Sequence, residues 1–190
     1  MKISIRLAAV AAAALLAACG QMGTAAPTGP NASATLAPTT GNTAAGTVTF
    51  SQAGDQVLVH ARVSGLKPGQ EHGFHVHEKG DCSSADFMSA GGHFNPGGKP
   101  HAHYGKPERH AGDLQNLRAD SEGNATYAFE TKLLTVAPGP TSVVGRAVVI
   151  HANPDDYASQ PAGNSGPRIA CGLIRAVDEG TGPVYPRLSR

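Results

Sequence analysis

The sequence predicts an all-β fold, an antiparallel sandwich or flattened barrel of eight short strands. No helical period of apolar residues runs for any length, whereas short segments of alternating apolar and polar residues recur along the chain. Glycine, proline, asparagine and aspartate separate these segments, as turn residues do between strands. Two long connections, 78–111 and 152–168, interrupt the pattern. Loops of this length in a compact domain usually have a functional role, so we expect these two loops to contain the functional residues.

Eight segments account for the strands, taken in chain order. Residues 32–38 are expected to pair at most as an edge strand, within an otherwise polar stretch. The next two segments flank Ala53-Gly54-Asp55, a sequence typical of a hairpin turn. Asp120 to Asn124 is a second predicted turn. The predicted strands after the first are 46–51, 56–64, 72–77, 113–118, 124–130, 146–150 and 169–176.

The chain begins with the pattern of an export signal. Lys2 and Arg6 precede an apolar run that ends at Ala18 and is too short to span a membrane comfortably, so residues 1–18 are predicted to be a signal peptide. The run closes in Leu16-Ala17-Ala18-Cys19, which resembles a bacterial lipoprotein cleavage box. We therefore expect lipidation of Cys19; the alternative is ordinary secretory cleavage nearby. Lipidation predicts a periplasmic protein that contacts a membrane only through its lipid anchor.

The remaining chain divides by composition. Residues 19–44 are poor in bulky apolar side chains and are predicted to form a flexible tether. Residues 45–177 are long enough for one folded domain, and residues 178–190 are expected to be a loose tail. The formal net charge of +1 argues against a nucleic-acid partner.

Two cysteines, Cys82 and Cys171, lie within the predicted domain. Because the protein is expected to enter an oxidising compartment, a disulfide between them is the first interpretation. The alternative is a pair of buried free thiols.

Six of the nine histidines lie in short clusters that together are able to hold two metal ions. His75 and His77 alternate on a predicted strand, so both imidazoles can face one ion; the alternative is a surface pair or a packed polar face. His151 ends another apolar strand, where its side chain can project from the edge of the sheet; the alternative is a structural histidine. Imidazole is a good ligand for both copper and zinc.

A second set of candidate ligands lies within one loop rich in glycine and proline. It offers three imidazole nitrogens and one carboxylate oxygen, a closed tetrahedral set suited to zinc. His103, two residues after His101, is an alternative to His101 as a zinc ligand. His72 and His60 are interpreted as structural. The four members of the set are His93, His101, His110 and Asp113.

The chain resembles the copper/zinc superoxide dismutases of the bacterial secreted type. The resemblance covers roughly residues 43–177 and includes several motifs in order and with compatible spacing. One is Gly73-Phe-His-Val-His-Glu78, and another is Glu108-Arg-His-Ala-Gly-Asp113. The others are Gly80–Ser84, Ser89–Pro96, Val148–His151 and Gly163–Gly172.

The resemblance implies a Greek-key arrangement, two metal cofactors and a role for each ligand. Copper would be held by His75, His77, His93 and His151. Zinc would be held by His93, His101, His110 and Asp113, so His93 would bridge the two ions. The family's disulfide maps onto Cys82 and Cys171, and its outer carboxylate onto Asp155, although Asp156 next to it is an alternative.

The resemblance also implies the reaction, the disproportionation of superoxide into dioxygen and hydrogen peroxide. Arg168 corresponds to the arginine that guides the anion, and His93 would supply a proton; a surface ion pair with Asp155 or Asp156 is the alternative for Arg168. The loop 152–167 contains no lysine or arginine, so any steering by lysines must come from elsewhere. A lipoprotein that only stores copper and zinc is the rival function. The resemblance leaves a monomer and a homodimer both open.

Overall fold

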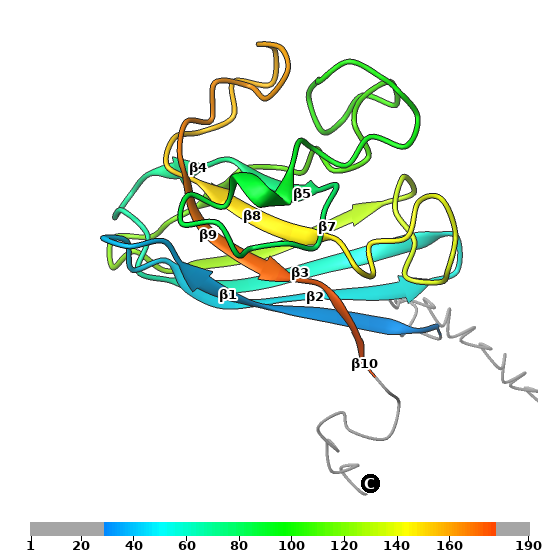
Figure 1. Cartoon of the computed structure of the whole chain (residues 1–190), viewed down its shortest axis with the longest axis horizontal. Coiled ribbons are helices and arrows are strands. Elements are labelled where there is room, and N and C mark those ends of the chain that lie inside the picture. The colour runs from blue at the N-terminus through cyan, green and yellow to red at the C-terminus, as the bar shows by residue number, and fades with distance from the viewer. Residues whose placement is uncertain (1–28, 178–190) are drawn as a thin grey trace, which may run out of the picture.

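The computed structural model describes residues 29–177 (Figure 1). The predicted signal peptide, Cys19 and the C-terminal tail lie outside the described residues. Within residues 29–177, no helix is long and apolar enough to cross a membrane. The helical structure of this part is a single 3-10 turn, η1 (Met88–Ala90).

The predicted all-β class is confirmed. The strands are β1 (Asn31–Pro38), β2 (Ala45–Ala53), β3 (Gln56–Ser64), β4 (Glu71–His72), β5 (Phe74–His77), β6 (Leu117–Arg118), β7 (Ala125–Thr131), β8 (Ala147–His151), β9 (Arg168–Leu173) and β10 (Arg175–Val177). All of their pairings are antiparallel.

One curled sheet contains eight of these strands, in the order β5-β8-β9-β1-β2-β3-β7, with β10 also paired to β1. The pairs β3–β7 and β5–β8 join strands that are distant in sequence. Such pairings result from the long crossover connections of a Greek-key barrel. A short β4–β6 ladder continues from the start of β5, and β6 also contacts β7. The two long connections follow β5 and β8, and parts of both lie above the same side of the sheet (Figure 1).

The structure corrects the predicted tether and the predicted domain boundary. Strand β1 lies within 19–44, and it is a central strand that pairs with β2, β9 and β10. Its buried inward residues are the small Ala32 and Ala34 together with Leu36, so the stretch has less bulk than an ordinary core strand. The folded domain therefore begins before residue 45, and β1 is not an edge strand.

Three other predicted strands differ from the observed ones. Residues 72–77 divide at Gly73 into β4 and β5. Of residues 113–118 only β6 is a strand, while Asp113 makes an isolated bridge to His75. Residues 169–176 divide at Ile174 into β9 and β10.

The two faces of β5 and β8 separate the core from the functional side chains. Phe74, Val76 and Ile150 point inward and belong to the main core. The alternate residues His75, His77 and His151 therefore face outward, yet they are buried because the two long loops cover them. The fold thus provides a rigid strand floor for a group of histidines.

Candidate metal centre

Seven predicted ligands converge into two groups that share His93. The ligand atoms of each group lie within 4.8 Å of one another, and every member is buried. The His75 group consists of His75, His77, His93 and His151, and the Asp113 group consists of His93, His101, His110 and Asp113. Sequence reasoning thus selected the side chains that the fold brings together, and it left out none of the seven.

The His75 group presents ring nitrogens that lack protein partners. The buried atoms His75 Nδ1 and His93 Nε2 accept and donate no hydrogen bond. His77 Nε2 and His151 Nε2 face each other at 3.4 Å. Because buried polar atoms are normally satisfied, this convergence of nitrogens fits a bound metal ion with imidazole ligands.

The Asp113 group surrounds one carboxylate oxygen with three imidazoles. Asp113 Oδ1 lies 2.8 Å from His93 Nδ1, 3.0 Å from His101 Nδ1 and 3.1 Å from His110 Nδ1. The other oxygen, Oδ2, accepts from the backbone N–H groups of Ala102 and His110. The backbone thus fixes the carboxylate and leaves one oxygen for the centre of the group, a donor set of three nitrogens and one oxygen.

Each outward histidine is oriented through its second nitrogen. His77 Nδ1 donates to the carbonyl oxygen of Gly91 at 2.9 Å, and His151 Nδ1 donates to that of Gly166 at 3.1 Å. These bonds fix the ring tautomers and leave the opposite nitrogen free to bind a metal. Sequence patterns gave no signal for the two carbonyl groups, because any residue supplies one.

Asp155 connects the two groups. Its Oδ2 accepts from His75 Nε2 at 2.8 Å, and its Oδ1 accepts from His101 Nε2 at 2.9 Å. Asn116 holds the backbone of Asp155 through two hydrogen bonds, at 3.0 Å each. Gly163 packs so closely that a Cβ atom there would collide with Asp155 Oδ1. Sequence reasoning had no means of finding Asn116.

The neighbouring Asp156 has a different role. It is exposed, and its carboxylate accepts hydrogen bonds from Ser159 and Asn164. These bonds hold its pKa at about 2. Of the two adjacent acids, it is therefore Asp155 that contacts the histidines.

Burial sets the protonation of the histidines. It lowers the pKa of His75 and of His77 well below the usual value, and the repulsion that each would meet from a protonated His93 lowers both further. Burial likewise lowers the pKa of His93, and it lowers that of His151 to about 4. Neutral imidazole, the form that binds metals, is therefore the resting state of the His75 group.

His101 behaves differently. Burial alone would lower its pKa, but hydrogen bonds to Asp113 and Asp155 outweigh burial and raise it to about 9. The same contacts lower the pKa of both carboxyl groups despite their burial.

Arg168 is held at the edge of the His75 group by two carbonyl oxygens. Its Nη1 donates to Phe87 at 2.6 Å, and its Nη2 donates to Gly91 at 2.5 Å. No carboxylate of the described residues forms an ion pair with it. The guanidinium is half-buried, so it keeps donors for a small anion.

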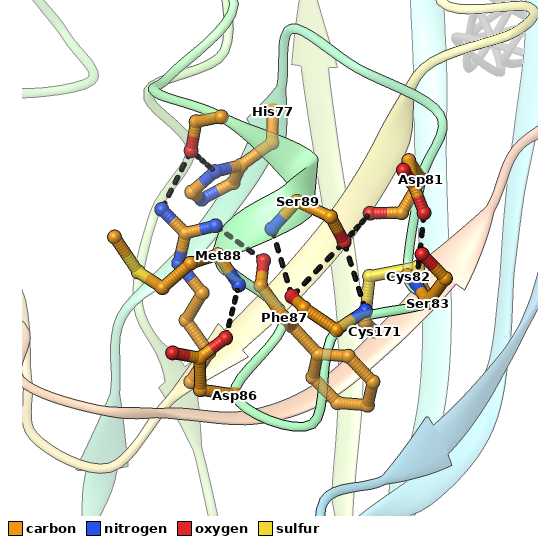
Figure 2. The surroundings of a disulfide bond; sticks show 12 residues. His77, Asp81, Cys82, Ser83, Asp86, Phe87, Met88, Ser89 and Cys171 are labelled. Atoms are coloured by element: carbon orange, nitrogen blue, oxygen red, sulfur yellow. Dashed lines mark hydrogen bonds between the residues drawn. A yellow bond between two sulfur atoms is a disulfide. The ribbon is translucent and has the colours of Figure 1, made fainter.

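A disulfide anchors the loop that carries these carbonyl groups (Figure 2). Cys82 and Cys171 are bonded with a Cα–Cα distance of 5.9 Å, which confirms the predicted pair. Phe87 packs in a small cluster against the disulfide. The Ser89 hydroxyl donates to the Asp81 carbonyl and so closes the loop (Figure 2).

The three other histidines of the sequence lie outside both groups. His72 Nδ1 donates to the His151 carbonyl at 2.8 Å, a structural bond beneath the site. His103 accepts from the Gly105 amide and packs against Tyr104 and Tyr157, so it is not placed as a competing ligand. His60 is exposed on β3.

Fold and site define a Greek-key β-barrel protein with a histidine-rich centre for two metals. The family model of copper/zinc superoxide dismutase (SODC) matches residues 44–174. Superoxide dismutase [Cu-Zn] 2 of Aquifex aeolicus is 45% identical over 123 residues, which cover 63% of this chain and 72% of that protein.

Solved structures agree with this comparison. The structure of the clock protein EA4 has a TM-score of 0.71 and 38% identity, and the match covers 77% of this chain and 94% of that one. A double mutant of a SOD-like protein from Bacillus subtilis gives a TM-score of 0.67 and 37% identity, covering 74% and 94%.

The chain therefore belongs to the copper/zinc superoxide dismutase family. Its activity is the disproportionation of superoxide, and its cofactors are copper and zinc.

Proposed function

We propose that the His75 group binds copper and the Asp113 group binds zinc, with His93 shared between them. The observation that carries this assignment is the orientation of His93. Its Nδ1 contacts Asp113, whereas its Nε2 is buried without a partner. The His93 ring belongs to both groups, so the free Nε2 is the atom we assign to the His75 group. Four imidazoles suit copper, and three imidazoles with one carboxylate suit a structural zinc ion.

Bound copper would supply the one-electron chemistry, taking an electron from one superoxide and giving it to the next, beside a zinc ion that does not change oxidation state. Solvent supplies the two protons that each hydrogen peroxide requires, and the chain relays one of them and supplies the geometry. His93 Nε2 is the atom proposed to take up a proton and then give it to the reduced oxygen species. The hydrogen bonds that the other imidazoles donate to Asp155, Gly91 and Gly166 hold these rings in place during this exchange.

Arg168 is proposed to attract and orient superoxide. Its guanidinium has no ion-pair partner among residues 29–177 and is fixed by carbonyl groups, so its charge is available to an incoming anion. A protein that only stored metals would have no use for a charge held in this way.

The metal assignment is tested by removing one ligand from each group. In His77→Ala we expect weak copper binding and an almost unchanged zinc content, and in His110→Ala the reverse. Metal content after dialysis and the copper(II) electron paramagnetic resonance spectrum measure the two effects. Loss of zinc alone from His77→Ala would contradict the assignment.

We also propose that the protein is exported and anchored through a lipid on Cys19. The support is the apolar run that ends at Cys19 and the disulfide, which is typical of an oxidising compartment. Metabolic labelling with a radioactive fatty acid tests this proposal, with Cys19→Ser as the control. Equal label in both proteins, or none in either, would refute lipidation.

A further inference from the structure

Arg109 carries a buried positive charge without a negative partner. The residue is 7% exposed, and no ion pair of the described residues includes it. Its three hydrogen bonds go to uncharged oxygens: the Asp113 carbonyl at 3.2 Å, the Lys106 carbonyl at 2.7 Å and the Thr131 hydroxyl at 3.4 Å. A guanidinium has five N–H donors, so two remain free.

Arg109 lines a groove of about 430 Å³ between the loop 104–109 and the end of β7. Lys106 and Lys132 add two positive charges to its walls, and Glu130 adds one negative charge. Lys132 forms an ion pair with Asp55 at 2.7 Å, so Lys106 is the lysine of the groove whose charge is available to a ligand. The apolar walls are Tyr104, Pro107, Phe129 and Leu133.

A buried charge is unfavourable unless a counter-ion accompanies it. A carboxylate matches the planar guanidinium fork and can accept two parallel hydrogen bonds from it.

We propose that this groove binds a small organic carboxylate. The carboxylate pairs with Arg109, with Lys106 at the rim, and an apolar body packs on Tyr104, Phe129 and Leu133. The site is separate from the metal groups, since Arg109 contacts the carbonyl oxygen of Asp113 and the metal-group histidines contact its carboxylate. A bound carboxylate would therefore brace the backbone of the zinc-binding loop from outside.

The test supplies the missing counter-ion from the protein itself. Thr131→Asp places a carboxylate where the Thr131 hydroxyl now accepts from Arg109, and Thr126→Asp places one at an exposed position of the same strand. Benzoate binding to the copper- and zinc-loaded protein is measured by calorimetry. We expect benzoate to bind at least tenfold more weakly to Thr131→Asp than to the wild type, and equally to Thr126→Asp and the wild type.

Acetate and inorganic phosphate identify the recognised chemistry. At the groove, measured as the affinity lost in Thr131→Asp, both should bind more weakly than benzoate, because neither has an apolar body for the walls. A larger loss of phosphate affinity than of benzoate affinity in Thr131→Asp would overturn the proposal, and so would equal benzoate affinity for the wild type and Thr131→Asp, or no benzoate binding to the wild type.

A second pair of variants tests the proposal if Thr131→Asp does not fold. Lys106→Glu changes the exposed rim, and Lys67→Glu makes the same change at an exposed lysine that does not line the groove. We expect at least threefold weaker benzoate binding only in Lys106→Glu; equal binding in the two variants would refute the proposal. Calorimetry uses no superoxide, so this outcome does not depend on the proposed metal assignment.

Discussion

His77 and Arg168 donate to the same carbonyl oxygen, that of Gly91, at 2.9 Å and 2.5 Å. One imidazole of the His75 group and the proposed anion-guiding charge are therefore oriented by a single peptide group. That peptide belongs to a loop anchored by the Cys82–Cys171 disulfide. A Cβ at Gly91 would collide with the Glu78 carboxylate, and its φ of +74° also favours glycine. The geometry of the metal centre thus depends on the integrity of this loop.

Replacement of Arg168 by alanine should lower the superoxide disproportionation rate roughly tenfold or more, because a local positive field raises anion encounter rates by this order. Copper and zinc content should stay the same, since Arg168 binds no ligand nitrogen. Pulse radiolysis measures the rate. Arg118→Ala, an exposed arginine of β6, is the matched control. A fully active Arg168→Ala protein would refute the guiding role.

Asp155→Asn should weaken metal binding by roughly 10–100-fold, the usual cost of removing a group that orients metal ligands. The variant loses the charge that accepts hydrogen bonds from both His75 and His101. Competition with a chelator measures the affinity. Asp156→Asn makes the same change on the exposed neighbour and should bind both metals normally; equal effects would show that Asp155 does not connect the groups.

Reduction of the disulfide should destabilise the protein by about 2–5 kcal/mol, since the bond closes a long loop in the unfolded chain. The sequence separation of the two cysteines is 89. Urea unfolding of the metal-free protein with and without reductant measures the change. We also expect a lower superoxide rate after reduction, because the loop supplies both carbonyl acceptors of Arg168. Unchanged stability and rate would contradict this role of the loop.

The metal-free protein should be most stable near pH 6.5, the ordinary histidine pKa. His151, with a folded pKa of about 4, stays neutral while the unfolded chain takes up a proton, so stability falls as the pH drops from about 6.5 to 4. His75 and His77 act in the same direction. His101, with a pKa of about 9, holds a proton in the folded state, so its contribution is lost as the pH rises from about 6.5 to 9.

Urea unfolding of chelator-treated protein at about pH 4.5, 6.5 and 9 measures this dependence. Each group contributes at most about 1.4 kcal/mol per pH unit. Stability that rises as the pH falls from 6.5 to 4.5 would show that these histidines are not buried in their neutral form.

Deletion of residues 1–44 should abolish folding, whereas deletion of residues 1–28 should preserve it. The larger deletion removes β1 and exposes the ladder edges of β2 and β9 in the middle of the sheet. Circular dichroism and thermal unfolding distinguish the two proteins. A cooperative transition in the shorter protein would mean that β1 is dispensable.

Much of the site was predictable because its residue types are distinctive. His75 and His77 alternate on a strand, and the ligands of the Asp113 group lie within one loop. The chemistry of imidazole and carboxylate limits what such a set does. Partners of the site that are distant in sequence were not predictable. Asn116 and the Gly166 carbonyl are ordinary groups, and only the folded chain brings them to the metal centre.

The fold class was predictable from alternation, but the place of β1 was not. Its inward residues are mainly alanines, so its burial depends on neighbours rather than on its own hydrophobicity. A break between two strands was also missed at Gly73, which separates β4 from β5. These features depend on tertiary contacts.

The most direct test is the rate of superoxide disproportionation by the protein loaded with one copper and one zinc ion. We predict a rate near the diffusional range, roughly 10⁸–10⁹ M⁻¹s⁻¹, that falls with added salt. A protein that binds both ions tightly but performs no better than free copper would contradict the account and favour metal storage.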